Sequence, residues 1–188
     1  MRTRIRDWEE GDHGGRKMKP MIIAFSGRPG SGKSTLSRII SKKLNAVYLR
    51  IDTIEGFMTG TCKIDVGMKD YELSQVIAFD NLELGNIVVS DGCNYSKNTR
   101  NGWEKIADEA KCKCINIEVK CSDNDERRRR LSERHYDLSP ETIDDIMKEH
   151  FEEWDKEHTI IDTISSSTDR CVDDIMTIIN KEKDGQRH

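Results

Sequence analysis

The sequence predicts an α/β domain with an open sheet, and two observations carry this prediction. Apolar runs of strand length alternate along the chain with segments whose apolar residues recur at helical spacing. A glycine-rich loop joins the first apolar run, residues 21–26, to a helical pattern formed by Leu36, Ile39, Ile40 and Leu44. At 188 residues, the chain is long enough for one domain with a sizeable core.

The loop from Gly27 to Ser34 reads Gly-Arg-Pro-Gly-Ser-Gly-Lys-Ser, which matches the phosphate-binding P-loop, or Walker A motif. Its glycines let the backbone pass close to a phosphate, while the loop N–H groups and the positive end of the following helix attract the anion. We expect Lys33 to reach the β- and γ-phosphates of a nucleotide, and the Ser34 hydroxyl to bind magnesium. The alternative is a glycine-rich turn without a ligand. The expected nucleotide-binding residues are Gly27, Arg28, Pro29, Gly30, Ser31, Gly32, Lys33, Ser34 and Thr35.

Composition argues against several functions. The formal net charge is −4, whereas nonspecific nucleic-acid binding needs a basic surface. No apolar run approaches the ~20 residues of a membrane span, and the first twenty residues lack the apolar core of a signal peptide. The six cysteines show neither Cys-x-x-Cys pairs nor histidines at zinc-ligand spacing. We therefore expect a cytoplasmic protein with reduced thiols and no membrane contact.

The chain divides into three parts. Residues 1–20 are polar, mixed in charge and rich in glycine, which predicts a flexible N-terminal extension. Residues 21–181 form the P-loop domain, and residues 182–188 form a polar tail.

Two aspartates follow apolar runs that we interpret as strands. Asp52 comes after residues 46–51, and ligands of open α/β sheets bind at the carboxyl ends of strands, so Asp52 is a candidate base for a substrate hydroxyl. Its alternative role is to cap a short helix over residues 54–57. Asp91 ends the run 86–91 and fits a Walker B carboxylate, which holds magnesium through water.

Several polar residues near these strand ends leave two interpretations open. Asn94 is either a substrate contact or an Asx-turn residue. Arg100 either holds a substrate anion or lies on the surface. Asp162 and Thr163 end the last predicted strand, residues 159–162, beside the P-loop, where they would border the adenine.

A run of arginines predicts a short lid. Arg127 to Arg130 and Arg134 follow a helix start at Cys121-Ser122-Asp123. Arg130 and Arg134 are four residues apart and share a helix face, so they could stabilise the negative charge that phosphoryl transfer spreads over the moving group. Arg127 is a weaker candidate, and the alternative for the whole run is a solvated helix face.

The remaining elements follow from periodicity. Residues 58–68 read as a loop, and residues 69–84 as a helix packed through Leu73, Val76, Ile77 and Leu82. Further helices are expected over 99–111, from Ser139 to Trp154 with His150 packed on the apolar stripe, and after Thr168. Another strand is expected over 114–119.

In this order the motifs resemble the P-loop kinase superfamily, and most closely its small AAA-type kinase family, which is related to adenylylsulfate kinase, chloramphenicol phosphotransferase and polynucleotide kinase. The resemblance covers roughly residues 21–180, and only the P-loop is specific by itself. Its carriers are Gly27 to Ser34, Asp52, Asp80-Asn81-Leu82-x-x-Gly85, Val88 to Asp91, Asn94, Thr99-Arg100, Trp103, Cys121 to Asp123, Arg130, Arg134, Trp154 and Ile161 to Thr163.

This resemblance implies a three-layer sandwich with a five-stranded parallel sheet, ordered 2-3-1-4-5, and a short helical lid. It implies ATP and Mg²⁺ as cofactors and a small molecule as phosphate acceptor, whether adenylylsulfate-, nucleoside-, sugar- or antibiotic-like. The expected catalytic residues are Lys33, Asp52, Arg130 and Arg134, with Ser34 and Asp91 at the metal. The alternatives are a nucleic-acid end or tRNA kinase and a regulatory nucleotide-binding NTPase. We expect a monomer or a homodimer.

Overall fold

Five parallel strands in the order β2-β3-β1-β4-β5 form the centre of the fold, which confirms the strand order that the resemblance implied. The computed structural model describes residues 19–133 and 139–184. The strands are β1 (Met21–Ser26), β2 (Val47–Arg50), β3 (Ile87–Asp91), β4 (Lys113–Lys120) and β5 (Thr159–Asp162). Phe25, near the end of β1, lies opposite Asp91 of β3. The start of the P-loop and the predicted Walker B carboxylate are therefore neighbours at the same edge of the sheet.

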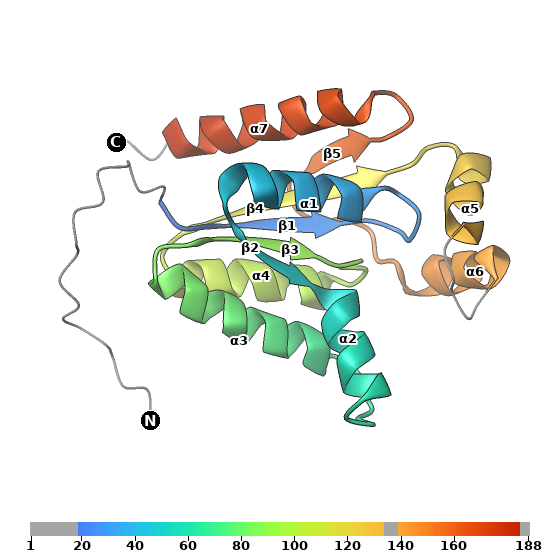
Figure 1. Ribbon diagram of the computed structural model, residues 1–188, viewed down its shortest axis with the longest axis horizontal. Coiled ribbons are helices and arrows are strands. Elements are labelled where there is room, and N and C mark those ends of the chain that lie inside the picture. The colour runs from blue at the N-terminus through green and yellow to red at the C-terminus, as the bar shows by residue number, and fades with distance from the viewer. Residues whose placement is uncertain (1–18, 134–138, 185–188) are drawn as a thin grey trace.

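Helices cover both faces of this sheet and its carboxyl end. They are α1 (Lys33–Leu44), α2 (Ile51–Gly60), α3 (Lys69–Glu83), α4 (Lys97–Glu109), α5 (Asn124–Ser132), α6 (Pro140–His150) and α7 (Thr168–Asp184). Helices α1 and α7 lie on one face and α3 and α4 on the other, while α5 and α6 stand beyond the strand ends (Figure 1). In the described part of the chain, no helix is long and apolar enough to cross a bilayer.

Strand β1 is buried on both faces, and its alternating side chains feed two separate cores. Met21, Ile23 and Phe25 join the core under α1 and α7. Ile22 and Ala24 join the core that contains the α3 and α4 residues. This double burial explains why the strand before the P-loop reads as a continuous apolar run.

The prediction for residues 46–68 was partly wrong. Strand β2 ends at Arg50, and α2 begins at Ile51 and continues to Gly60, where we expected a short helix over 54–57 and a loop from residue 58. Ile51, Ile54 and Met58 recur at helical spacing, and their side chains are buried or half-buried. That periodicity extends the helix at both ends.

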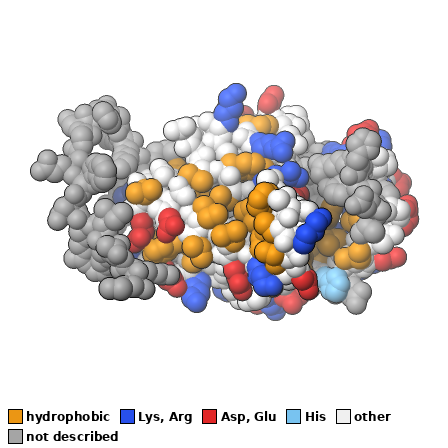
Figure 2. All heavy atoms as spheres, turned by 60° about the horizontal axis from the view of Figure 1, so that its bottom comes forward, with side chains coloured by type: hydrophobic (Ala, Val, Ile, Leu, Met, Phe, Trp, Pro, Cys, Tyr) orange, Lys and Arg blue, Asp and Glu red, His pale blue; other side chains and the backbone are white. Residues whose placement is uncertain are grey.

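The prediction of the buried face of α3 was right for Ile77 and Leu82, which pack in the core, and wrong for the other two residues. Leu73 and Val76 are 44% and 57% exposed, and hydrophobic side chains gather on this outer side of the molecule (Figure 2). The buried stripe runs instead through Tyr71, Ser74 and Ala78. Ser74 can lie inside because its hydroxyl donates to the Asp70 carbonyl at 2.6 Å, which satisfies the buried polar group.

The helix that begins after Ser139 ends at His150, four residues before the predicted end, and His150 is exposed rather than packed. Phe151 is already extended, and the chain turns back along the domain. The Glu152 N–H donates to the Tyr95 carbonyl at 2.8 Å, a contact that a continued helix would not allow.

Candidate functional site

The P-loop backbone adopts a shape that requires its glycines. Gly27, Gly30 and Gly32 have φ angles of 138°, 82° and 96°, in the region that favours glycine. A Cβ on Gly27 would also lie 2.2 Å from the Val119 carbonyl oxygen. The loop can therefore pass between β4 and a ligand only without a side chain at this position.

Helix α1 begins inside the loop and leaves its first turn open to a ligand. Its N-cap is Gly32, which has no side chain to bond the unpaired N–H groups of the first turn. Lys33 and Ser34, the first two helical residues, are buried, with 5% and 9% of their surface exposed. These N–H groups and the positive end of the helix make a site for an anion.

The predicted metal residues meet directly behind the loop. The Ser34 hydroxyl donates to the Asp91 carboxylate at 3.2 Å, and Asp91 is 1% exposed. The Tyr48 hydroxyl donates to the second carboxylate oxygen at 2.6 Å. Burial first, and then the Asp91 carboxylate, raise the pKa of Tyr48, so this phenol stays a donor. Hydroxyl and carboxylate oxygens are donors that magnesium prefers, so Ser34 and Asp91 fit that ion.

Asp52 lies in the first turn of α2 and joins the same edge of the sheet. Its carboxylate forms an ion pair with Arg50 at 2.9 Å and remains partly exposed. Burial raises the pKa of the Cys93 thiol, Lys33 lowers it, and the charges of Asp52 and Asp91 raise it further. Lys33, Asp52 and Asp91 therefore all lie within electrostatic reach of the Cys93 thiol.

Asn94 holds the end of β3 in place through buried hydrogen bonds, and its side chain is not exposed for contact with a substrate. It is fully buried with φ at 47°, and its amide donates to the Phe25 carbonyl at 2.8 Å. The Trp103 indole N–H donates to the side-chain oxygen of Asn94 at 3.0 Å. The backbone N–H of Asn94 donates to the Tyr71 hydroxyl at 3.0 Å. These bonds fix the chain just beyond Asp91.

Replacing Trp103 with phenylalanine should lower the free energy of unfolding by about 2–3 kcal/mol, because the Asn94 oxygen loses its donor in a buried site. Trp154→Phe is the matched control, since the Trp154 indole N–H has no hydrogen-bond partner among the described residues. Urea denaturation of both variants measures the difference. Equal losses in the two variants would show that the Trp103–Asn94 bond contributes nothing.

Arg100 fits neither role that the sequence left open. It is 3% exposed, and one guanidinium nitrogen donates to the carbonyls of Glu152 and Glu153, both at 3.1 Å. Its guanidinium also lies 4.5 Å from the centre of the Trp154 ring. Arg100 therefore fastens the segment after α6 to α4.

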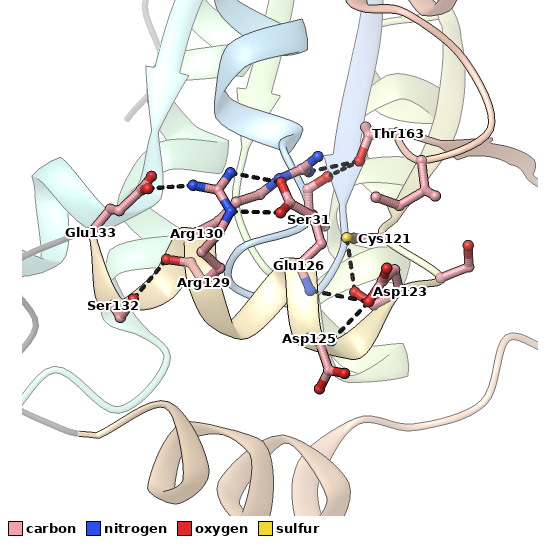
Figure 3. A network of polar contacts seen from close by, with 12 residues as sticks. Ser31, Cys121, Asp123, Asp125, Glu126, Arg129, Arg130, Ser132, Glu133 and Thr163 are labelled. Carbon is pink, nitrogen blue, oxygen red and sulfur yellow. Dashed lines mark hydrogen bonds and ion pairs between the residues drawn. The ribbon is translucent and has the colours of Figure 1, made fainter.

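Arg130, the first of the two arginines predicted to act in the lid, lies beside the P-loop at the end of β5. Arg130 donates to the Thr163 hydroxyl at 2.9 Å, and that hydroxyl donates to the Ser31 carbonyl at 2.9 Å (Figure 3). Arg130 also forms an ion pair with Glu126 at 2.8 Å. Arg130 and Thr163 border a hollow of about 390 Å³ next to Gly32, so Thr163 lies beside the P-loop as predicted. Arg134 lies outside the described residues.

Arg127, the weaker candidate, is buried and forms an ion pair with Asp144 of α6. Asp144 also pairs with Arg128 at 3.0 Å. Burial alone would raise the pKa of Asp144, but the hydrogen bonds and charges of the two arginines outweigh it, so the net direction is downward. The carboxylate is thus held ionised in the folded protein.

This lowered pKa predicts an acid-sensitive lid. The ion pairs of Asp144 stabilise the fold above its ordinary pKa of 3.8, and this contribution disappears as the pH falls through the lower pKa of the folded state. Asp144→Asn should therefore be less stable than the wild type at pH 7, and the gap should narrow as the pH falls below about 4. Denaturant unfolding at several pH values tests this, and a gap independent of pH would contradict it.

The fold and this site define an α/β domain built around a P-loop. Residues 22–158 match the family model described as an AAA domain, and the chain belongs to that family. No curated protein matches the chain in a sequence search.

Solved structures share the fold at low identity. One is a protein from Chloroflexus aurantiacus j-10-fl, with a TM-score of 0.70 and 17% identity, covering 88% of this chain and 98% of that one. A gluconokinase from Sinorhizobium meliloti 1021 has a TM-score of 0.64 and 15% identity, covering 93% and 100%. The Mycobacterium tuberculosis APS kinase CysC, solved in complex with AMPPNP and APS, has a TM-score of 0.64 and 14% identity, covering 87% and 99%. This likeness concerns the fold alone.

Sequence reasoning missed Tyr48, the partner of Asp91, and the clamp that Tyr71 and Trp103 place on Asn94. The only local signal for Tyr48 was a hydroxyl-bearing side chain between the apolar residues Val47 and Leu49. Nothing in the sequence marked its partner, 43 residues away.

Proposed function

We propose that this protein is an ATP- and Mg²⁺-dependent kinase that transfers the γ-phosphate to a hydroxyl group of a small molecule. The observation that carries the proposal is the Ser34–Asp91 pair, buried directly behind a P-loop that is open at the start of α1. Two proteins that share the fold, the gluconokinase and the APS kinase, are kinases by name.

The P-loop would bind the phosphates of the nucleotide, and the hollow beside it would bind the adenine. The loop N–H groups and Lys33 hold the phosphates, since a buried ammonium next to these donors favours a polyanion. The adenine enters the hollow beside Gly32, where Arg130 and Thr163 lie. The contacts of Arg130 favour a role in positioning the nucleotide, and Arg134 remains our candidate for the transferring phosphate.

Ser34 and Asp91 would hold magnesium, with the Asp91 carboxylate acting through water. When bound, the ion offsets the charge between the β- and γ-phosphates. Tyr48 holds Asp91 in place from the opposite side, so the carboxylate is oriented before any ligand arrives.

Asp52 would orient the acceptor. Its carboxylate is partly exposed and already paired with Arg50, an arrangement that suits accepting a hydrogen bond from a substrate hydroxyl. The acceptor oxygen then forms a bond to the γ-phosphorus as the bond to the β–γ bridging oxygen breaks. ADP leaves, and the hydroxyl proton passes to Asp52 or to water.

A panel of hydroxyl-bearing metabolites, including sugars, nucleosides and an oligonucleotide with a free 5′-hydroxyl, tests the proposal with purified protein, ATP and magnesium. We expect ADP release above the background without acceptor for at least one small molecule, together with a phosphorylated product. ADP release that no acceptor stimulates would reject the transfer, and transfer to the oligonucleotide alone would reject the acceptor class.

A further inference from the structure

Residues 28–31 of the P-loop, which we call its crown, form a tight turn in which the Pro29–Gly30 peptide can take two orientations. The Ser31 N–H donates to the Arg28 carbonyl at 3.1 Å, and Gly30, the third residue of the turn, has φ at 82°. Proline in the second position and a glycine of positive φ in the third define a type II turn. Rotation of the Pro29–Gly30 peptide would give a type I turn, which differs mainly in the direction of this one peptide.

The orientation of this peptide decides whether the loop can bind a phosphate. In a trans peptide the carbonyl and the following N–H point in opposite directions. When the Pro29 carbonyl faces outward, the Gly30 N–H faces inward, toward the concave side of the loop where phosphates are bound. A rotated peptide would present a carbonyl oxygen to the phosphate instead.

The Pro29 carbonyl faces α5, because a side chain of that helix contacts it. Arg127 of α5 donates to the Pro29 carbonyl oxygen at 3.4 Å. A Cβ on Gly30 would lie 2.8 Å from the Arg127 carbonyl oxygen and 2.9 Å from its Cγ, so α5 lies directly against the crown. Arg127 is 3% exposed, and a charged donor close to a carbonyl interacts with it more strongly in such a low-dielectric site than in water.

The other end of the same guanidinium is fixed to α6. Arg127 forms a buried ion pair with Asp144, whose side chain is 6% exposed. Arg128 pairs with the same carboxylate, but its side chain is 45% exposed. Arg127 therefore joins both α5 and α6 to the P-loop, whereas Arg128 contacts only the Asp144 carboxylate of α6 among these partners.

We propose that Arg127 is a positioning residue that selects the nucleotide-competent orientation of the Pro29–Gly30 peptide and couples α5 and α6 to the P-loop. This inference rests on the proposed nucleotide binding. Because glycine permits both turn types, the contact from Arg127 adds to the preference for the type II turn that the Pro-Gly sequence already has. Loss of that contact reduces the competent fraction, and the apparent Kd for nucleotide rises by the inverse of that fraction.

Arg127→Lys tests the proposal, with Arg128→Lys as the matched control. Lysine keeps the charge beside Asp144 but lacks the planar fork that reaches both partners. We expect the Kd for ATP with magnesium to rise about tenfold in Arg127→Lys, with a parallel rise in KM and little change in kcat at saturating ATP. Arg128→Lys should keep the wild-type Kd, and melting temperatures show that both variants are folded.

Asp144→Asn provides a second route, in case Arg127→Lys does not fold. It leaves Arg127 in place but removes its anchor on α6, so the ATP Kd should rise by a smaller factor than in Arg127→Lys. An unchanged Kd in Arg127→Lys or in Asp144→Asn, an equal rise in Arg128→Lys, or a loss of kcat at unchanged KM would overturn the inference. A wild-type protein that does not bind ATP would instead overturn the proposed function.

Discussion

Lys33→Ala should lower the rate of phosphate transfer by at least about 10²–10³-fold while the protein remains folded. Lys33 is 5% exposed and sits at the first position of α1, where its ammonium is directed to the phosphates by the loop geometry we propose. In a water-excluded site, this charge acts on the negative charge of the moving phosphoryl group with little screening. Turnover at saturating ATP, with circular dichroism as the check on folding, measures the effect.

Lys42→Ala is the control for this prediction. Lys42 is an exposed lysine in the last turn of the same helix, so its removal changes the net charge equally without reaching the loop. Its turnover should match that of the wild type. A folded Lys33→Ala variant with wild-type turnover would reject phosphate transfer at this loop.

Asp91→Asn should raise the magnesium concentration needed for half-maximal activity by about 10–100-fold. Asparagine preserves the size of the side chain and can still accept from Tyr48, so the buried packing at this 1% exposed position is kept. What is lost is the negative charge beside Ser34, which the proposed ion needs. Activity measured across a magnesium titration reports this shift directly.

Asp52→Asn separates the metal role from the acceptor role. We expect this variant to keep the magnesium requirement of the wild type but to lose turnover with the acceptor, because we propose that Asp52 orients the acceptor hydroxyl from its position beside Arg50. If Asp91→Asn kept the wild-type magnesium requirement, or if Asp52→Asn shared its shift, the assignment of Asp91 would be wrong.

Local patterns in the sequence were enough to predict the strands and the P-loop, whereas the strand order came from the family resemblance. The P-loop is a contiguous motif whose glycines have a backbone function, and the buried strands read as apolar runs because helices cover both faces of the sheet. Asp91 could be predicted because a parallel sheet brings the ends of neighbouring strands to one edge, where it meets Ser34.

The parts that sequence reasoning missed depend on distant partners or on a choice between similar patterns. Arg127 and Pro29 are 98 residues apart, so nothing local distinguished Arg127 from the other arginines in its run. On α3, the predicted stripe of Leu73 and Val76 and the observed stripe of Tyr71 and Ala78 both fit helical spacing. The observed stripe is the one that brings Tyr71 inward, where its hydroxyl accepts a hydrogen bond from the Asn94 backbone N–H.

The central claim is that the loop before α1 binds the phosphates of ATP together with magnesium. Isothermal titration of the folded protein with ATP, with and without magnesium and with Lys33→Ala in parallel, tests it most directly. We predict saturable binding with a Kd at or below millimolar, tighter with magnesium and strongly weakened in the variant. No heat at millimolar ATP and magnesium, or equal affinity in wild type and Lys33→Ala, would contradict the claim.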